Sequence, residues 1–135
     1  MRDFVLDASA AIDYAQSGSG ANKMEQLLAD AVRRQLRLYI SVLHLAEVFY
    51  LTWQKTGEER ARETVAGFSR LPIQIVQVDL PQALKAGELK ARHKIPYVDC
   101  IAAALALQQN ATLVTADRDF EKLGRHFPIL WLTRP

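Results

Sequence analysis

The stretch YVDCIAAALAL, residues 97–107, sets one aspartate at the start of an apolar run. No residue from Ile101 to Leu107 carries a charge, and the alanines and leucines are strong helix formers. A helix that is apolar on every side is usually buried inside a domain. Asp99 therefore stands where an unpaired carboxylate is costly to bury, and its position needs an explanation.

Two explanations fit Asp99 when it is considered alone. Aspartate is a favoured helix N-cap because its side chain accepts a hydrogen bond from a free backbone N–H of the first turn. Pro96, three residues upstream, also suits a helix start. Alternatively, Asp99 joins other acidic side chains in a functional site. The places of the other acids in the fold decide between the two.

The composition predicts a globular protein of the cytoplasm. The chain has 135 residues, which is enough for one core, and we expect a single domain over residues 1–135. Hydrophobic residues make up 50% and charged residues 24%, and the net charge of +2 does not by itself indicate a polyanionic partner. The chain has one cysteine, no signal-peptide pattern, and no apolar stretch near the roughly 18 residues of a membrane span. We therefore expect no membrane association.

Short β-rich apolar runs alternate with longer helical patterns along the chain. The predicted strands are residues 4–7, 38–41, 73–78, 112–115 and 129–132. The predicted helices are residues 8–16, 21–35, 42–56, 57–71 and 81–94, the helix that begins with YVDC, and a short helix near 119–124. This alternation predicts βαβ units, and hence a three-layer α/β/α sandwich with a mostly parallel central sheet.

Four acidic residues are predicted to share one edge of this sheet. Ligands of open parallel α/β sheets bind beyond the carboxyl ends of the strands. Asp7 ends the first strand and Asp117 lies just past a later one. Glu47 lies about two turns into the helix after the second strand, and Asp99 opens another helix, so both can reach the same edge.

Each acid also has a structural explanation. Asp7 fits the N-cap of the helix that follows it. Glu47 fits an ion pair with a distant lysine or arginine, although it is the only charged residue in VLHLAEVFYLTW. Asp117 and Asp119 fit a turn or a helix cap after a strand.

Taken together, the acids favour a metal site. Two carboxylates about 4 Å apart repel by about 4 kcal/mol at an effective dielectric constant near 20. Four of them therefore need raised pKa values or a divalent cation. Oxygen ligands without a cysteine or histidine cluster favour Mg²⁺ or Mn²⁺ over Zn²⁺, and such sites commonly serve phosphate chemistry. We therefore interpret Asp99 as a metal ligand rather than a cap.

Four ordered segments carry a resemblance to a known family. They are FVLDASAAI (4–12), ISVLHLAEVFYL (40–51), YVDCIAAALAL (97–107) and LVTADRDFEKL (113–123). In this order and spacing the sequence resembles the PIN-domain family, and more narrowly the VapC-type ribonuclease toxins of toxin–antitoxin pairs. The resemblance implies a catalytic and metal-binding set of Asp7, Glu47, Asp99 and Asp117, with Asp119 as a further metal ligand acting through water. It also implies that Ser9 and Thr115 are polar residues bordering the site.

The resemblance further implies an activity and partners. It implies Mg²⁺- or Mn²⁺-dependent endonucleolytic cleavage of single-stranded RNA, a homodimer, and inhibition by a cognate antitoxin protein. Because a metal-activated water attacks instead of the ribose 2′-hydroxyl, we expect products with 5′-phosphate and 3′-hydroxyl ends. RNA also needs cations, and the candidates are Lys90, Arg92 and Lys94 before the YVDC helix, and Arg118 beside an acid. A solvated helix end explains the first three equally well.

Other residues receive structural assignments. We expect Asp13 to face solvent on the first helix and His44 to lie at a helix surface or interface. The aromatic residues Phe49, Tyr50 and Trp53 are assigned to the core or to a dimer contact, and an apolar face there could also receive an antitoxin helix.

Alternative functions remain open. The chain could be a non-catalytic PIN-like module that binds RNA or a partner, or a PIN nuclease of RNA processing outside a toxin–antitoxin system. A haloacid-dehalogenase-type phosphotransferase needs a second aspartate where this chain has Ser9, and a receiver domain needs paired acids at the first strand. Both fit poorly.

Overall fold

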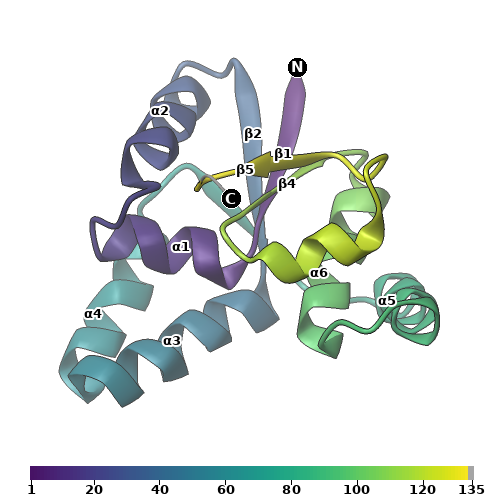
Figure 1. Cartoon of the computed structure of the whole chain (residues 1–135). Coiled ribbons are helices and arrows are strands. Elements are labelled where there is room, and N and C mark those ends of the chain that lie inside the picture. The colour runs from purple at the N-terminus through teal and green to yellow at the C-terminus, as the bar shows by residue number, and fades with distance from the viewer. Residues whose placement is uncertain (134–135) are drawn as a thin grey trace.

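Strands and helices alternate along the chain in the computed structural model, which describes residues 1–133 (Figure 1). The last two residues of the predicted domain, 134–135, lie outside the described part. The strands are β1 (Arg2–Leu6), β2 (Leu36–Ser41), β3 (Ile73–Val76), β4 (Thr112–Thr115) and β5 (Ile129–Trp131). The helices are α1 (Ala8–Ala15), α2 (Ala21–Val32), α3 (Val42–Thr56), α4 (Glu58–Phe68), α5 (Leu80–Arg92), α6 (Tyr97–Gln108) and the 3₁₀ helix η1 (Arg118–Leu123).

The five strands of residues 1–133 form one sheet in the order β3-β2-β1-β4-β5, and all neighbouring pairs are parallel. The chain first adds β2 and β3 on one side of β1, and then crosses to add β4 and β5 on the other side. The winding therefore reverses between β1 and β4. Such a switch point leaves a crevice at the carboxyl ends of the two strands, where ligands of α/β sheets bind.

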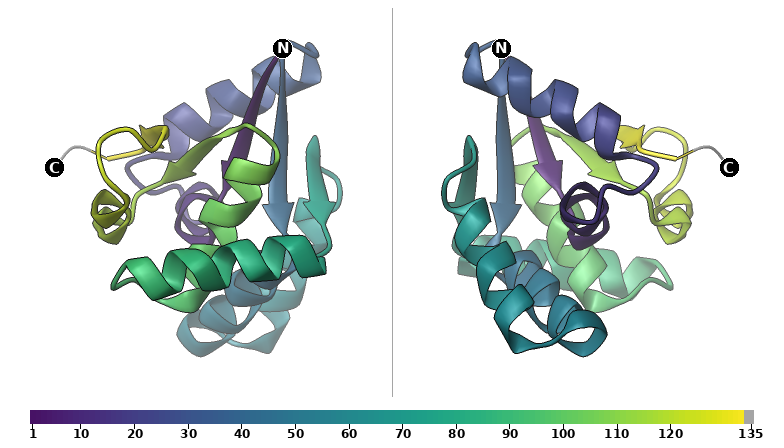
Figure 2. Two further views of the ribbon diagram at one scale, coloured as in Figure 1. Left: turned by 90° about the vertical axis from the view of Figure 1, so that its right-hand side faces the viewer. Right: turned by 90° about the vertical axis from the view of Figure 1, so that its left-hand side faces the viewer.

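Helices cover both faces of the sheet, which confirms the predicted α/β/α architecture. Alternate side chains of a strand point to opposite faces. On β1, Phe4 and Leu6 pack with residues of α1 and α2, whereas Val5 packs with residues of α6. The two views of Figure 2 show α2 on one side of the sheet and α5 with α6 on the other.

Helix α6 is buried on almost every side because it lies between two layers. Ala102, Ala103 and Leu105 pack toward the sheet. Ile101 and Ala104 pack in a separate cluster with Ala86 of α5. The uniform apolar composition of the stretch therefore reflects two packed faces rather than a membrane segment. No helix within residues 1–133 is both long and apolar enough to span a bilayer.

Helices α3 and α4 form a hairpin beyond the carboxyl ends of the strands (Figure 1). Gly57 joins them with a φ of +100°, in the left-handed region that favours glycine. Tyr50 is 48% exposed and Trp53 is 41% exposed, so the core assignment of these two residues is wrong. Both lie away from the buried side of α3, which includes Val48 and Thr52, and the Arg62 guanidinium of α4 lies 5.8 Å from the centre of the Trp53 ring. A dimer contact there stays a prediction.

Asp13 does not face solvent freely, and that prediction is wrong. Its side chain is half-buried, and Oδ2 accepts a hydrogen bond from the Gly20 backbone N–H at 2.6 Å. A Cβ atom at Gly18 would lie 1.8 Å from Asp13 Oδ1, and one at Gly20 would lie 2.3 Å from Oδ2. The glycines of SGSG therefore allow the loop after α1 to close around the Asp13 carboxylate.

Candidate active site

A cleft of about 370 Å³ opens at the switch point of the sheet. Four of its lining side chains are the acids predicted from the sequence, and they come from four separate segments: Asp7, Glu47, Asp99 and Asp117. We call this the acid cleft. Asp7 directly follows β1, and Asp117 lies two residues after β4. The parallel sheet thus brings together residues that are far apart in the sequence.

Asp7 is held rigidly at the floor of the acid cleft. Its carboxylate accepts hydrogen bonds from the Ser9 hydroxyl at 2.7 Å, the Ala10 backbone N–H at 2.9 Å and the Thr115 hydroxyl at 2.5 Å. The Ala10 contact makes Asp7 the N-cap of α1, so the cap explanation holds together with a place in the cleft. Burial outweighs the three donors and raises the pKa of Asp7 to about 6.

The hydroxyls of Ser9 and Thr115 connect the segment after β1 to the segment after β4. Besides donating to Asp7, Thr115 accepts from the Asp117 backbone N–H at 2.9 Å, and Ser9 accepts from the Ala116 N–H at 3.0 Å. Each hydroxyl has one proton, and each proton is directed at Asp7. Ser9 lines the acid cleft, Thr115 is buried behind Asp7, and together they fix the start of α1 against the end of β4. That both residues border a functional site stays a prediction.

Asp99 has no structural role as a cap. It is the third residue of α6, Pro96 is the N-cap residue, and no side chain caps this helix. The cap explanation is therefore wrong. Asp99 is 9% exposed, and its carboxylate has no hydrogen-bond or ion-pair partner within residues 1–133. Burial and then the surrounding carboxylates raise the pKa of Asp99 to about 7.

Glu47 completes the acid cleft from α3. Its side chain is half-buried, and it forms no ion pair with any lysine or arginine in the described part of the chain, so the ion-pair explanation is not supported there. Burial, followed by the charges of Asp7 and Asp117, raises the pKa of Glu47. No cation contributes to the pKa shifts of the three raised carboxyl groups.

Asp117 and Asp119 lie at the mouth of the cleft. Asp117 is the N-cap of η1 and accepts from the Asp119 backbone N–H at 2.9 Å, as the turn-and-cap explanation predicts. One carboxylate oxygen from each of Asp99, Asp117 and Asp119 lies within 4.8 Å of the other two. Asp119 is exposed, and Lys122 Nζ lies 3.6 Å from its Oδ1.

This donor set fits a hard divalent cation. Carboxylate oxygens are the preferred protein ligands of Mg²⁺ and Mn²⁺. The neighbouring carboxylates raise the pKa of Glu47 and of Asp99, and no protein cation acts against either shift. Asp99 in particular is a nearly buried acceptor without a donor, and a cation would satisfy it.

The sequence pattern of the PIN domain matches residues 4–126 of the chain. The chain belongs to the PIN domain family. The matched residues include the four acids that line the cleft. No curated protein matches the sequence closely enough to count as a relative.

Solved structures of toxin–antitoxin proteins share the fold of this PIN domain. The DNA-bound VapBC of Salmonella typhimurium is 23% identical, with a TM-score of 0.78 over 98% of this chain and 100% of that chain. VapBC2 of Rickettsia felis, bound to a promoter DNA fragment, is 20% identical, with a TM-score of 0.75 over 95% and 97% of the two chains. VapC20 of Mycobacterium tuberculosis, a sarcin–ricin loop cleaving toxin, is 17% identical, with a TM-score of 0.69 over 90% and 95%. At these identities the likeness shows the fold alone.

The predicted RNA-binding cations lie outside the acid cleft of this PIN domain. Lys90 Nζ donates to the Ile95 carbonyl at 2.8 Å, and Arg92 pairs with Glu88. Lys94 is exposed beyond the end of α5. The Arg118 guanidinium lies 4.1 Å from the centre of the Trp131 ring and donates to the Thr133 carbonyl. The RNA role of these residues stays a prediction.

His44 is buried, so its assignment to a surface or interface is wrong. Its side chain is 0% exposed, and neither ring nitrogen forms a hydrogen bond of good geometry within residues 1–133, although the Val98 backbone lies near the ring. Burial lowers the pKa of His44 to about 4, so the imidazole is neutral at pH 7. The sequence around it is apolar and gave no sign of which face of α3 would be covered.

Two polar residues that line the acid cleft were not assigned to it from the sequence. Asp13 and Gln16 lie on the cleft side of α1 and at its C-terminal end. The spacing from Asp7 to Asp13 on one short helix, followed by a glycine-rich loop, was the available signal. We read Asp13 as the anchor of that loop.

The raised pKa values predict that the metal-free protein loses stability as the pH rises. Asp99 and Asp7 have folded-state pKa values of about 7 and about 6, against 3.8 for the unfolded chain. Between these values the folded protein binds more protons, so the free energy of unfolding falls as pH increases from about 4 to about 7. In EDTA, we expect the melting temperature of wild type to fall more between pH 5 and 8 than that of Asp99→Asn. Equal pH dependence of the two proteins would contradict the assignment.

Proposed function

We propose that this PIN domain is a metal-dependent endoribonuclease that hydrolyses single-stranded RNA, and that it is the toxin of a type II toxin–antitoxin pair. One observation carries the proposal: four carboxylates from distant segments converge in one cleft with no protein cation to offset them. The likeness of the fold to VapC-type structures supports the toxin assignment. A non-catalytic module would have no need for this arrangement of repelling charges.

The roles of the residues follow from their contacts. We assign Asp7, Glu47, Asp99 and Asp117 to hold Mg²⁺ or Mn²⁺, with Asp119 acting through water. When bound, such an ion supplies Lewis-acid activation of water and stabilises the charge on phosphate oxygens. Ser9 and Thr115 orient the Asp7 carboxylate, as second partners of metal ligands commonly do. No hydrogen-bond donor within residues 1–133 contacts the Asp99 carboxylate, so its oxygens are free to turn toward a cation.

The partners and location belong to the same proposal. We infer RNA as substrate, a cognate antitoxin protein as inhibitor, a homodimer, and a cytoplasmic location for a single nuclease domain. Exposed apolar side chains on α3, including Leu43, Tyr50 and Trp53, support a protein contact on the hairpin. Burial of such side chains against another protein is favourable.

The direct test uses the purified chain without any partner. Labelled single-stranded RNA is incubated with Mg²⁺, with Mn²⁺ and with EDTA, and the ends of the products are analysed. We expect cleavage only with metal, and products with 5′-phosphate and 3′-hydroxyl ends. Binding without cleavage under all metal conditions would favour the non-catalytic alternative, and cyclic phosphate ends would contradict attack by water.

A further inference from the structure

A second hollow adjoins the acid cleft along α1. It measures about 570 Å³ and lies between the C-terminal end of α1 and helices α3 and α4. Gln16 lines both the acid cleft and this hollow, so the two lie side by side. The charged residues that line it are Lys55 of α3 and Arg60 of α4. We call it the basic hollow.

The two cations of the basic hollow are not neutralised by the protein. Lys55 Nζ donates to the neutral Gln16 Oε1 at 3.1 Å, and neither Lys55 nor Arg60 forms an ion pair within residues 1–133. Arg62, which lies two residues further along α4, is instead paired with Glu58 at 2.9 Å. An acid of this hairpin thus pairs with Arg62, whereas none within residues 1–133 pairs with Lys55 or Arg60.

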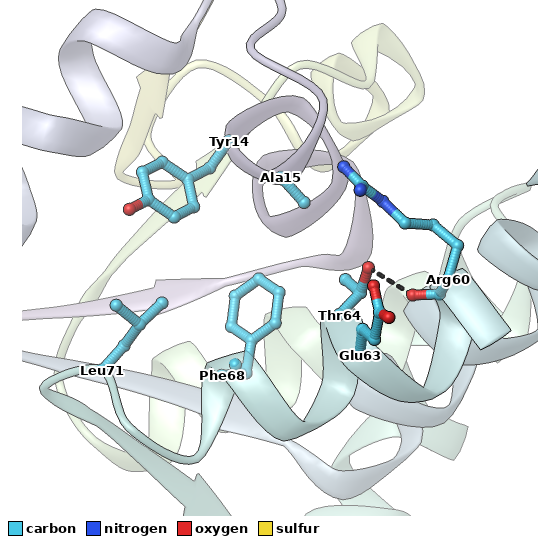
Figure 3. Close-up of a pocket in the computed structure, with 8 residues that line it drawn as sticks. Tyr14, Ala15, Arg60, Glu63, Thr64, Phe68 and Leu71 are labelled. Carbon is cyan, nitrogen blue, oxygen red and sulfur yellow. Dashed lines mark hydrogen bonds between the residues drawn. The ribbon is translucent and has the colours of Figure 1, made fainter.

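Arg60 also borders a third hollow of about 310 Å³ further along α4 (Figure 3). Figure 3 shows its guanidinium reaching toward Ala15 at the end of α1, with the Thr64 hydroxyl and the Glu63 carboxylate drawn below it. Thr64 donates its hydroxyl proton to the Arg60 carbonyl at 2.8 Å, and Thr56 donates to the Thr52 carbonyl at 2.9 Å. The donors left for a ligand are therefore Lys55, Arg60, the Gln16 amide and the Thr52 hydroxyl.

An RNA strand in the acid cleft needs this kind of surface. Its scissile phosphate would meet the metal, but the flanking phosphates would lie beside uncompensated carboxylates and be repelled by them. Cations that release counterions from the backbone supply much of the affinity for nucleic acids. The basic hollow places two of them directly next to the cleft.

We propose that the RNA strand leaves the acid cleft over Gln16 and that Lys55 and Arg60 bind phosphates flanking the scissile bond. This inference rests on the proposed ribonuclease function. Two other roles are possible for the same cations: they could stabilise the C-terminal end of α1 through the helix dipole, or bind an acidic segment of a partner protein. Both predict that RNA binding does not depend on them.

The test measures RNA binding by the double variant Lys55→Gln/Arg60→Gln. Fluorescence anisotropy of a labelled single-stranded RNA is measured at several KCl concentrations, with every protein also carrying Asp99→Asn so that the RNA is not cut. Two lost phosphate contacts should weaken binding at 50 mM salt at least about tenfold and reduce the slope of log K against log salt by about 1.4. The charge-retaining variant Lys55→Arg/Arg60→Lys should keep the parent slope.

A matched control removes two positive charges from the opposite edge of the sheet. Arg34 and Arg70 are exposed and precede β2 and β3, at the amino ends of the strands. Arg34→Gln/Arg70→Gln should leave the salt slope unchanged. If Lys55→Gln/Arg60→Gln binds RNA with the affinity and slope of this control, the inference is wrong. Failure of the wild type to cut RNA with metal would instead overturn the proposed function, so the two failures are distinguishable.

Discussion

Asp99→Asn is expected to lower metal-dependent RNA cleavage by about 100-fold or more. Loss of a residue that only supports a metal ligand typically lowers metal affinity or activity by about 10- to 100-fold. Loss of a ligand itself should therefore lower activity by about 100-fold or more. An asparagine side chain at this position would keep the shape of the aspartate but offer one neutral oxygen instead of an anionic pair. Cleavage of a labelled RNA under single-turnover conditions, with a titration of Mn²⁺, gives both the rate and the metal affinity.

The same substitution should not harm the fold in EDTA. The Asp99 side chain caps no helix and makes no hydrogen bond within residues 1–133, while its charge is repelled by the neighbouring carboxylates. The variant should therefore melt at the same temperature as wild type or higher at pH 8. Asp30→Asn in α2, outside the cleft, is the matched control and should retain full activity. Equal cleavage by Asp99→Asn and wild type would remove Asp99 from the catalytic set.

Thr115→Val is expected to lower activity by about 10- to 100-fold, although its side chain would not touch the substrate. Valine has nearly the same shape, but it removes the 2.5 Å hydrogen bond to the buried Asp7 carboxylate and leaves the part-buried Asp117 N–H without its acceptor. The free energy of unfolding should fall by about 1–3 kcal/mol, which is the cost of leaving such groups unpaired. Urea unfolding measures this part of the effect.

Further measurements separate positioning from general destabilisation. The Thr115 hydrogen bond lowers the pKa of Asp7, so its loss should move the acidic limb of the pH–rate profile to higher pH. Thr115→Ser retains the hydroxyl and should keep the wild-type pH profile while losing one methyl group of packing. A pH profile of Thr115→Val identical to that of wild type would show that the hydroxyl has no role in orienting Asp7.

The sheet and the convergence of acids follow from the sequence, because each depends on a general rule. Apolar runs of strand length separated by helical patterns lead to parallel pairing, and parallel pairing places Asp7 and Asp117 at one edge. The helix over residues 42–56 has the predicted bounds. Element ends were less predictable. Helix α2 ends at Val32 instead of residue 35, because Arg34 adopts a φ of +60° that stops the helix.

The other wrong predictions concern the burial of side chains whose surroundings come from distant segments of the chain. His44 and Tyr50 belong to the same helix, yet one is fully buried and the other 48% exposed. Periodicity does not separate them, because the helix is apolar on several faces and its orientation depends on contacts with α1, α4 and α6. Likewise, the sequence suggested either a helix cap or a place in the acid cleft for Asp7, whereas its carboxylate both caps α1 and lines the cleft.

The hydrogen bond between Thr115 and Asp7 joins residues that lie 108 positions apart. During translation at about 5–20 residues per second, the ribosome needs about 5–20 s to proceed from one to the other. A nascent chain that has not reached Thr115 also lacks Asp117, so it carries only some of the four cleft acids. The proposed site is therefore complete only late in translation. For a toxin, an antitoxin that is already present could bind each new chain before that chain cleaves RNA.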